Sequence, residues 1–234
     1  MIRAITFDFW NTLYKGPADR RVFDKRIKAV TQLLQQAGYD LSSEVVGVAF
    51  KAAWQKADRM QLEQYFDPTP RGQIEFALQD LQLQVDEHIK DELYQAYTSK
   101  LLEIPPDMND GVAETLPLLA EKHRLAVICN TGVTPGVILR QLMKKDKIFD
   151  YFQFLVFSDE VAWAKPNAAI FKYTLENIQM TSQQAAHIGD NEHTDVAGAK
   201  AAGMTTVWLA PDKTYTVPEA DYHVQSVREL LNLF

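Results

Sequence analysis

The chain of 234 residues contains a single cysteine, Cys129, so no disulfide can form within it. It has no uncharged apolar run approaching the roughly 18 residues that span a membrane. Basic residues are outnumbered, 24 against 31 acidic ones, and the resulting charge of −7 argues against nucleic acid as a partner. A signal peptide is not expected, because Asp8 interrupts the short apolar run at the start. We therefore expect a cytoplasmic protein that acts on neither membranes nor nucleic acid.

Apolar side chains, by contrast, are plentiful. They make up 47% of the sequence, which is more than a disordered chain carries. At roughly 150 residues per domain, the length allows one large domain or a domain with an insert. We expect a globular protein with a substantial core.

Short apolar runs, each typical of a buried strand, recur along the chain at residues 2–7, 125–129, 154–157, 185–188 and 205–209. Helical patterns lie between them at residues 112–122, 135–144, 168–178 and 194–202. Strands that alternate with helices predict an α/β fold, a Rossmann-like, doubly wound parallel sheet. A last edge strand and a closing helix at 227–233 are expected after a turn at 214–222.

Helix boundaries are suggested by four residues. Thr134 is expected to cap a helix whose first position is Pro135, and Gly203 is expected just after the end of another. Pro117 should kink the helix predicted over 112–122 or delay its start.

Residues 15–100 break the alternation. Apolar residues repeat there at helical spacing in four stretches, 22–37, 46–60, 74–81 and 89–101. This pattern predicts an α-helical bundle inserted as a cap after the first strand. The predicted division is a core of residues 1–14 and 101–234 and a cap of residues 15–100, which is nearly neutral and leaves most of the acidic excess in the core.

Polar residues follow the ends of successive core segments: Asp8, the turn at 129–132, Lys165 with Pro166, and Gly189-Asp190 with Asp195. The carboxyl ends of parallel strands meet at one edge of a sheet, so these side chains should lie together. Acids and a lysine brought together are costly unless they are paired or bind a metal ion. Phosphoryl transfer uses such a set, with a carboxylate nucleophile, a divalent cation and a fixed positive charge.

In the order and spacing of these residues, from 2 to about 209, the chain resembles the haloacid dehalogenase superfamily, in the branch with a helical cap after the first strand. The resemblance implies that Asp8 is the nucleophile of a covalent intermediate and that Thr131 and Lys165 assist it. It implies Mg²⁺ as cofactor, held by Asp8, the Trp10 carbonyl, Asp190 and Asp195. The substrate contacts it implies are Thr12, Asn130, Thr131, Lys165 and Trp10.

Two positions depart from the family pattern. Phosphatases of the family carry a second Asp where this chain has Trp10. Such an Asp acts as general acid and base, typically worth about 10² to 10⁴ in rate, and an indole cannot replace it. Cys129 stands where Ser or Thr is usual, and a thiol is a weak donor. We therefore expect Thr131 or the neighbouring backbone amides to bind phosphate, and Cys129 to be buried and inert.

We accordingly expect an Mg²⁺-dependent phosphohydrolase of a small anionic substrate, a phosphate ester or acyl phosphate. Trp10 leaves open a metal-free 2-haloacid dehalogenase, although the retained Asp190 and Asp195 favour a metal site. A catalytically weak protein that binds a phosphorylated ligand or a protein partner is a further alternative, and a phosphonatase would need Lys51 or Lys56 as a Schiff base.

The missing acid and the specificity need residues from elsewhere. Candidates for the acid are Glu192 and His193, although both suit a solvated helix start. The cap is expected to set specificity by closing over the site. Its first helix is locally basic over 19–28, so Arg20, Arg21 or Arg26 could meet an anionic substrate, although a solvated face is the expectation there. Four aromatic residues suit either the bundle core or a pocket: Trp54, Tyr65, Phe66 and Trp163.

Overall fold

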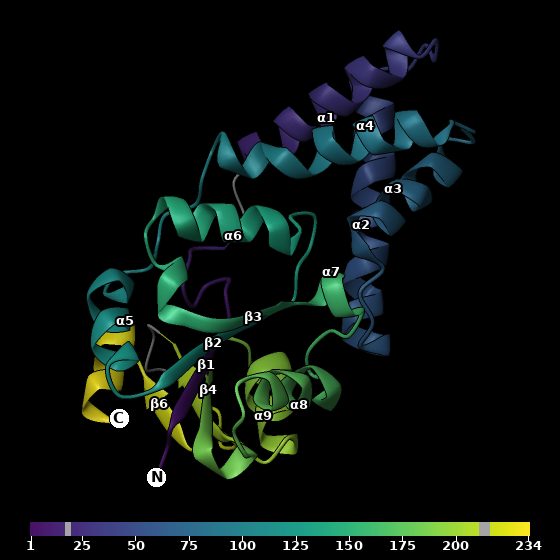
Figure 1. Ribbon diagram of the computed structural model, residues 1–234. Helices are drawn as coiled ribbons and strands as arrows, with labels where there is room; N and C mark the ends of the chain where they lie inside the picture. Colours follow the sequence, from purple (N-terminus) through teal and green to yellow (C-terminus); the bar gives the residue numbers. More distant parts are fainter. Residues whose placement is uncertain (17–19, 211–215) are drawn as a thin grey trace.

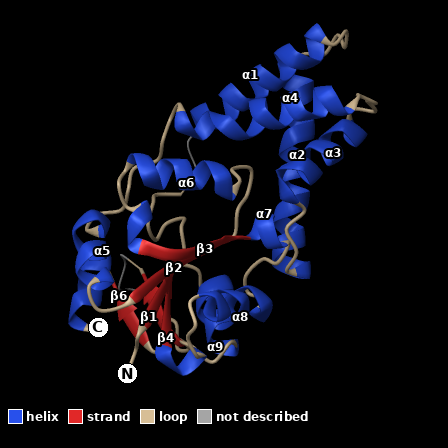
Figure 2. Cartoon of the chain, viewed as in Figure 1, coloured by secondary structure: helices blue, strands red, loops and turns tan. Residues whose placement is uncertain are grey.

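The computed structural model describes residues 1–16, 20–210 and 216–234. Within these ranges six parallel strands form one sheet in the order β3-β2-β1-β4-β5-β6 (Figures 1 and 2). The strands are β1 (Ala4–Phe7), β2 (Arg124–Cys129), β3 (Phe152–Phe157), β4 (Ala185–Gly189), β5 (Thr205–Leu209) and β6 (Tyr222–Val224). The predicted doubly wound α/β fold is confirmed, including the last edge strand. The turn predicted over 214–222 lies partly outside the described residues, as does the start of the cap predicted over 15–100.

β1 lies inside the sheet, between β2 and β4, and is buried along its whole length. Its side chains alternate between the two faces, so that Ile5 and Phe7 join one hydrophobic cluster and Ala4 joins another. Phe7 pairs with Val127 on one side and with Ile188 on the other. Asp8, the next residue, therefore emerges near the middle of the carboxyl edge of the sheet.

Helices cover both faces of the sheet. α5 (Val112–Ala120), α6 (Gly136–Lys145) and the 3₁₀ helix η5 (Val227–Asn232) contribute to the hydrophobic cluster on one face. α8 (Ala168–Asn177) and α9 (Gly198–Ala201) contribute to the cluster on the other. Figure 1 shows α6 and α8 on opposite sides of β3. Short elements complete this part: η1 (Ser99–Leu102), η2 (Phe149–Tyr151), α7 (Ser158–Val161), η3 (Ser182–Gln184) and the π-helical turn η4 (Glu192–Ala197).

The helices α1 (Arg20–Gln36), α2 (Ser43–Gln64), α3 (Thr69–Asp80) and α4 (Glu87–Thr98) follow β1 in the chain. They pack around a hydrophobic cluster of their own that includes Leu34, Phe50, Leu93 and Tyr97. We call these helices the cap helices. Among the described residues, no helix is long and apolar enough to cross a bilayer. The domain boundaries at residues 15 and 100 stay predictions.

The two connections between the cap helices and the sheet run side by side. The Lys15 amide donates to the Asp107 carbonyl, and the Asn109 amide donates to the Leu13 carbonyl, both at 2.9 Å. Tyr14 and Met108 form an antiparallel bridge between these bonds. A short paired ribbon therefore joins the cap helices to the sheet.

Three helix predictions need correction. Thr134 does not cap α6, because Pro135 is the cap residue and the Thr134 hydroxyl instead accepts a hydrogen bond from Arg26. The helix predicted over 194–202 begins earlier, as the π-helical turn η4, and α9 is only its last part. The closing segment predicted as a helix is a 3₁₀ helix. Gly203 has a φ of 77° beyond α9, as predicted, and Pro117 lies inside α5 without delaying its start at Val112.

Gly136, at the start of α6, tests the packing of this helix on the sheet. A Cβ at this position would lie 2.5 Å from Cδ2 of Phe157, so Gly136→Ala forces a buried ring to move. We expect a loss of about 1 to 3 kcal/mol in the free energy of unfolding, measured with urea. Gly47→Ala in α2 is the control: its new Cβ would meet only Ile27 at 3.6 Å, and a gain of about 0.5 to 1 kcal/mol is expected. Equal effects of the two substitutions would contradict this account.

Candidate active site

Three carboxylates meet at the carboxyl edge of the sheet. Asp8 follows β1, Asp190 follows β4 and Asp195 lies in η4. Each offers an oxygen atom that lies within 4.8 Å of the other two. The ammonium group of Lys165 lies between two of them, with its Nζ 2.6 Å from Asp8 Oδ1 and 2.5 Å from Asp195 Oδ1. The structure thus brings together four residues that the sequence motifs predicted as a site.

Lys165 is held in place by Asn130, which follows β2. The Asn130 side chain donates to the Lys165 carbonyl at 2.9 Å and accepts from the Lys165 amide at 2.7 Å. Both ends of the amide are therefore used on the backbone of Lys165. The Asn130 side chain thus positions the lysine, and the predicted contact of Asn130 with substrate stays a prediction.

Asp195 is oriented from the other side by a buried histidine that the sequence analysis missed. His187 lies in β4, and its Nε2 is 3.1 Å from Asp195 Oδ1, while its Nδ1 is 2.8 Å from the Thr6 hydroxyl. Burial lowers the pKa of His187, which favours the neutral ring. A neutral ring that donates through Nε2 and accepts at Nδ1 satisfies both contacts. Thr6 in β1 and His187 in β4 are register partners in the sheet. The signal that the sequence offered for this contact was one polar residue inside each of two apolar runs.

Close packing at Gly189 also shapes this corner of the site. A Cβ at Gly189 would lie 2.2 Å from Cγ of Asp195, closer than any side chain tolerates. The Asp195 carboxylate also accepts the Asn191 amide at 3.0 Å through Oδ2. Both oxygens of Asp195 are thus hydrogen-bonded, whereas Asp8 bonds Lys165 through Oδ1 alone.

The carboxylates differ in their electrostatics. Burial raises the pKa of Asp8 to about 7, although Lys165 acts in the opposite direction. Burial and the neighbouring Asp195 raise the pKa of Asp190 to about 6. Burial also opposes ionisation of Asp195, but Lys165 and His187 outweigh it and lower that pKa to about 2. One lysine against three carboxylates therefore leaves Asp8 and Asp190 short of positive charge.

The donor set at this edge fits a divalent cation. Carboxylate oxygens at such close spacing are the ligands that Mg²⁺ prefers, and an added cation lowers the pKa of each neighbouring acid. Asp8, Asp190 and Asp195 are the predicted side-chain ligands, with the backbone carbonyl of Trp10 as a fourth. These assignments stay predictions.

The polar groups of Thr131, the predicted phosphate donor, are hydrogen-bonded within the protein, and this role stays a prediction. Its hydroxyl is 1% exposed and donates to Asp67 Oδ2 at 2.9 Å, and its amide donates to the Ser158 hydroxyl at 2.8 Å. Both polar hydrogens are thus used within the protein. Cys129 is buried, as expected, and burial raises the pKa of its thiol well above the usual range.

Asp67 connects the cap helices to the sheet. It lies between α2 and α3, is fully buried, and accepts hydrogen bonds from Ser158 Oγ at 2.5 Å and from Thr131 Oγ1 and Gln61 Nε2 at 2.9 Å. Its other oxygen accepts from the Thr69 amide at 2.7 Å. Burial nevertheless raises the pKa of Asp67, because no cation pairs with it in the described part of the chain. We call this set of bonds the Asp67 latch.

The loop after Asp8 carries the remaining predicted residues. Trp10 is half-buried against Phe9, with ring centroids 4.9 Å apart. Asn11 has a φ of 57° and donates to Asp190 Oδ2 at 3.0 Å. The Thr12 hydroxyl is buried and has no hydrogen-bond partner among the described residues, so its predicted substrate contact stays a prediction.

Other predicted side chains lie on the surface. Glu192 and His193 are exposed, and His193 faces Tyr65 with ring centroids 6.3 Å apart. The aromatic residues Tyr65, Phe66 and Trp163 are also exposed, so they belong neither to the bundle core nor to the cavity described below. Trp54 is the one of the four predicted aromatic residues that lines that cavity.

The chain belongs to the haloacid dehalogenase-like hydrolase family, whose profile matches residues 2–203. This membership confirms the resemblance inferred from the motifs and makes the protein a hydrolase. The family alone does not define the reaction, because its members here include both phosphatases and dehalogenases.

Individual relatives illustrate this range. A ribulose-1,5-bisphosphate 5-phosphatase from Halopiger xanaduensis is 24% identical, over 100% of this chain and 99% of its own. The structure is similar to that of a 2-haloacid dehalogenase from Pseudomonas syringae, with a TM-score of 0.73 and 22% identity over 100% of this chain and 98% of the other. A haloacid dehalogenase-type phosphatase from Thermococcus onnurineus gives a TM-score of 0.67 and 22% identity over 99% and 97%. At such identities the two structures show the fold. Several further curated relatives match over about half of their own length.

The Asp67 latch leads to a prediction about stability and pH. The pKa of Asp67 is higher in the folded protein than the value of about 3.9 expected when unfolded, so folding favours its protonated form. This stabilisation is fully present below about pH 3.9 and is lost as the pH rises through the folded-state pKa. Asp67→Asn leaves buried donors without acceptors, at a cost of about 1 to 3 kcal/mol. The advantage of the wild type over Asp67→Asn in urea unfolding should shrink as the pH rises.

Ser158→Ala provides the companion measurement. It removes the side-chain donor that most favours the ionised form of Asp67, so the pKa should rise further. The stability advantage of Ser158→Ala over the double variant Ser158→Ala/Asp67→Asn, measured in urea, should then persist to higher pH. An advantage that grows with pH would contradict the raised pKa.

Proposed function

We propose that the protein is an Mg²⁺-dependent phosphohydrolase that acts on a small phosphorylated molecule through an aspartyl-phosphate at Asp8. The observation that carries the proposal is the meeting of Asp8, Asp190 and Asp195 around a single lysine. Without further positive charge, the cluster keeps Asp8 partly protonated near neutral pH, whereas a nucleophilic carboxylate has to be ionised. When bound, Mg²⁺ supplies the positive charge that ionises Asp8 and offsets the charge of a phosphate group.

Asp8 and Lys165 divide the work of the first step. Asp8 Oδ2 has no hydrogen bond to the described residues, so it is the oxygen that attacks phosphorus, in line with the leaving oxygen. Lys165 keeps Asp8 oriented through Oδ1 and stabilises the charge on the phosphoryl oxygens. The Asn130 clamp and the His187–Asp195 contact keep the ammonium group at this place. Water then hydrolyses the aspartyl-phosphate and frees Asp8.

Trp10 determines which leaving groups depart readily. Its indole cannot donate a proton to an alkoxide or accept one from water, and Glu192 and His193 lie exposed, outside the hydrogen bonds of Asp8. Leaving groups that need no proton, as in acyl and aryl phosphates, therefore suit this site. Alkyl phosphates such as sugar phosphates should react slowly.

Metal dependence tests the proposal directly. We expect release of phosphate from acetyl phosphate and phenyl phosphate with Mg²⁺, and no release after EDTA treatment. Asp8→Asn should lower turnover by roughly 10³-fold or more, because the nucleophile is lost. Asp190→Asn should raise the Mg²⁺ concentration needed for half-maximal rate, measured at saturating substrate. Phosphate release that EDTA leaves intact would refute the metal site.

Trp10 itself gives a second test. Trp10→Asp restores a carboxylate at this position and should raise the rate on a sugar phosphate by about 10²-fold or more, with a smaller gain on acetyl phosphate. Trp10→Asn is the matched control, since it has the same size as Asp and no acid. Equal rates for the Asp and Asn variants would show that position 10 is not where the acid is missing.

Trp10 also favours a second candidate, a metal-free 2-haloacid dehalogenase, in which Asp8 displaces halide from carbon. An aromatic residue in place of the second Asp is compatible with that reaction, whereas it needs no metal-binding acid at the position of Asp190. Chloride release from chloroacetate in the presence of EDTA would favour the dehalogenase. If neither phosphate nor chloride is released, thermal stabilisation by phosphorylated ligands would favour the third alternative, a binding protein.

A further inference from the structure

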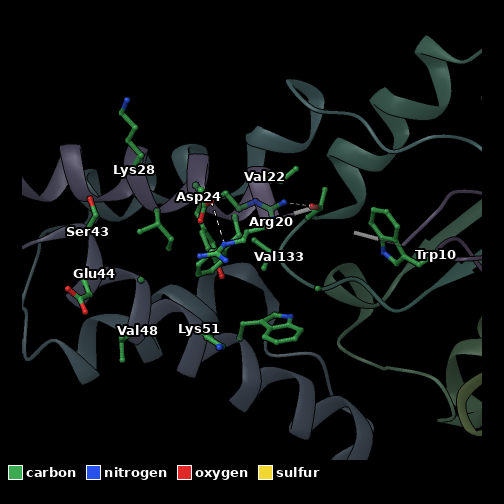
Figure 3. A pocket seen from close by; sticks show the side chains of 18 residues that line it. Trp10, Arg20, Val22, Asp24, Lys28, Ser43, Glu44, Val48, Lys51 and Val133 are labelled. Atoms are coloured by element: carbon green, nitrogen blue, oxygen red, sulfur yellow. Dashed lines mark hydrogen bonds and ion pairs between the residues drawn. The ribbon is translucent and has the colours of Figure 1, made fainter. Parts of the chain in front are cut away.

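A cavity of about 870 Å³ lies between the cap helices and the sheet. Its walls come from α1 and α2, from Trp10 in the loop after Asp8, and from residues 132–134 after β2. Figure 3 shows Trp10 at one end of the cavity and Ser43 and Glu44 at the other. Trp10 is two residues from Asp8, so the cavity reaches the loop that carries Asp8 and extends from there along α1 and α2.

Arg26, in α1, is the buried charge of this cavity. Its side chain is 7% exposed, which corrects the expectation that this face of α1 is solvated. Its Nη2 donates to the Thr134 hydroxyl at 2.6 Å, and its Nε is buried without a hydrogen-bond partner in the described residues. Within the same residues no carboxylate pairs with it. Burial lowers the pKa of Arg26 to about 10, which is still well above neutral pH, so the guanidinium is charged.

A buried charge without a counter-ion costs free energy, and proteins keep such groups where a ligand supplies the opposite charge. Arg20, on the same helix, shows the contrast, because it is exposed and lies 3.8 Å from Asp24. The Arg26 guanidinium also faces the ring of Tyr97, with its Cζ 6.0 Å from the ring centroid. An aromatic face attracts a cation weakly and leaves its charge in place.

The surroundings of Arg26 favour an anion with an apolar body. Basic side chains outnumber acidic ones in the lining, with Arg20, Arg26, Lys28 and Lys51 against Asp24 and Glu44. Apolar side chains from both helices also line the cavity, among them Val22, Ile27 and Trp54. The planar guanidinium matches the geometry of a carboxylate or a phosphate better than a lysine does.

We propose that Arg26 binds a second anionic group of the substrate, a carboxylate or a second phosphate, at the end remote from the phosphoryl group that Asp8 attacks. This inference rests on the proposed phosphohydrolase activity and names the class of its substrate. The apolar body of that substrate lies between Trp10 and the cap helices. Thr134 holds the guanidinium ready, so Arg26 acts as a specificity residue.

The experiment compares three aryl phosphates with the same ring and the same leaving oxygen: phenyl phosphate, 4-carboxyphenyl phosphate and 1,4-phenylene bisphosphate. With the wild type, kcat/KM should be higher for one or both compounds that carry a second anion. Arg26→Gln should lower the ratio of their kcat/KM to that of phenyl phosphate by roughly 10- to 100-fold. The compound whose ratio falls more identifies the natural anion as carboxylate or phosphate.

Lys25→Gln is the matched control. It removes the same charge from α1, but Lys25 is exposed, pairs with Glu103 and does not line the cavity. The ratios should stay within about twofold of the wild type. Ratios that Arg26→Gln and Lys25→Gln change equally would overturn the proposal, because the effect would then be one of overall charge. Because each ratio compares two substrates on the same variant, a partly unfolded sample does not alter it.

A binding measurement separates this inference from the proposed activity. Calorimetry with 4-hydroxybenzoate and with phenol needs no turnover. Tighter binding of 4-hydroxybenzoate to the wild type, with the preference lost in Arg26→Gln, supports the anion site even if no phosphate is released from any compound. Equal binding of the two compounds, together with ratios of kcat/KM that do not depend on Arg26, would overturn it while leaving the phosphohydrolase intact.

Discussion

The ammonium group of Lys165, shared between Asp8 and Asp195, is the contact on which the rest of the site depends. A lysine that is 1% exposed needs its charge balanced, and two carboxylates from different strand ends do this. Asn130 fixes the backbone of the lysine and His187 fixes the second carboxylate. Each of these groups comes from a different core segment, so the site exists only when the parallel sheet has formed and brought the strand ends together.

The cap helices depend on the same strand ends for their position. Asp67 is bonded to Thr131 after β2 and to Ser158 after β3, so the loop between α2 and α3 rests on the edge that carries the carboxylates. The cavity and its buried Arg26 then face the loop of Trp10. In the proposed reaction, Asp8 at the end of β1 carries the chemistry and Arg26 in α1 selects the substrate.

Sequence patterns predicted much of this arrangement because strand ends in a parallel sheet have a fixed meeting place. The positions of Asp8, Lys165, Asp190 and Asp195 after successive core segments were enough to predict that these residues lie together. The patterns did not reveal the partner of the Thr131 hydroxyl, because Asp67 lies between two cap helices, 64 residues away, and follows no motif. They placed Arg26 on a solvated face, since a helical repeat shows which residues share a face but not which element covers that face. His187 was missed because a histidine within an apolar strand resembles a packed core residue.

The paired ribbon formed by Leu13–Lys15 and 107–109 has a mechanical consequence. The two connections are hydrogen-bonded to each other, so they move together and not as two independent linkers. The cap helices are fastened a second time at the Asp67 latch, where Asp67 bonds Ser158 at the start of α7. Turning the cap helices about the ribbon would have to break the bonds of this latch together with that of Gln73 to the Gly132 carbonyl and that of Arg26 to Thr134. The cap helices are thus anchored at several points, and a change at any one of them changes how firmly they are held over the sheet.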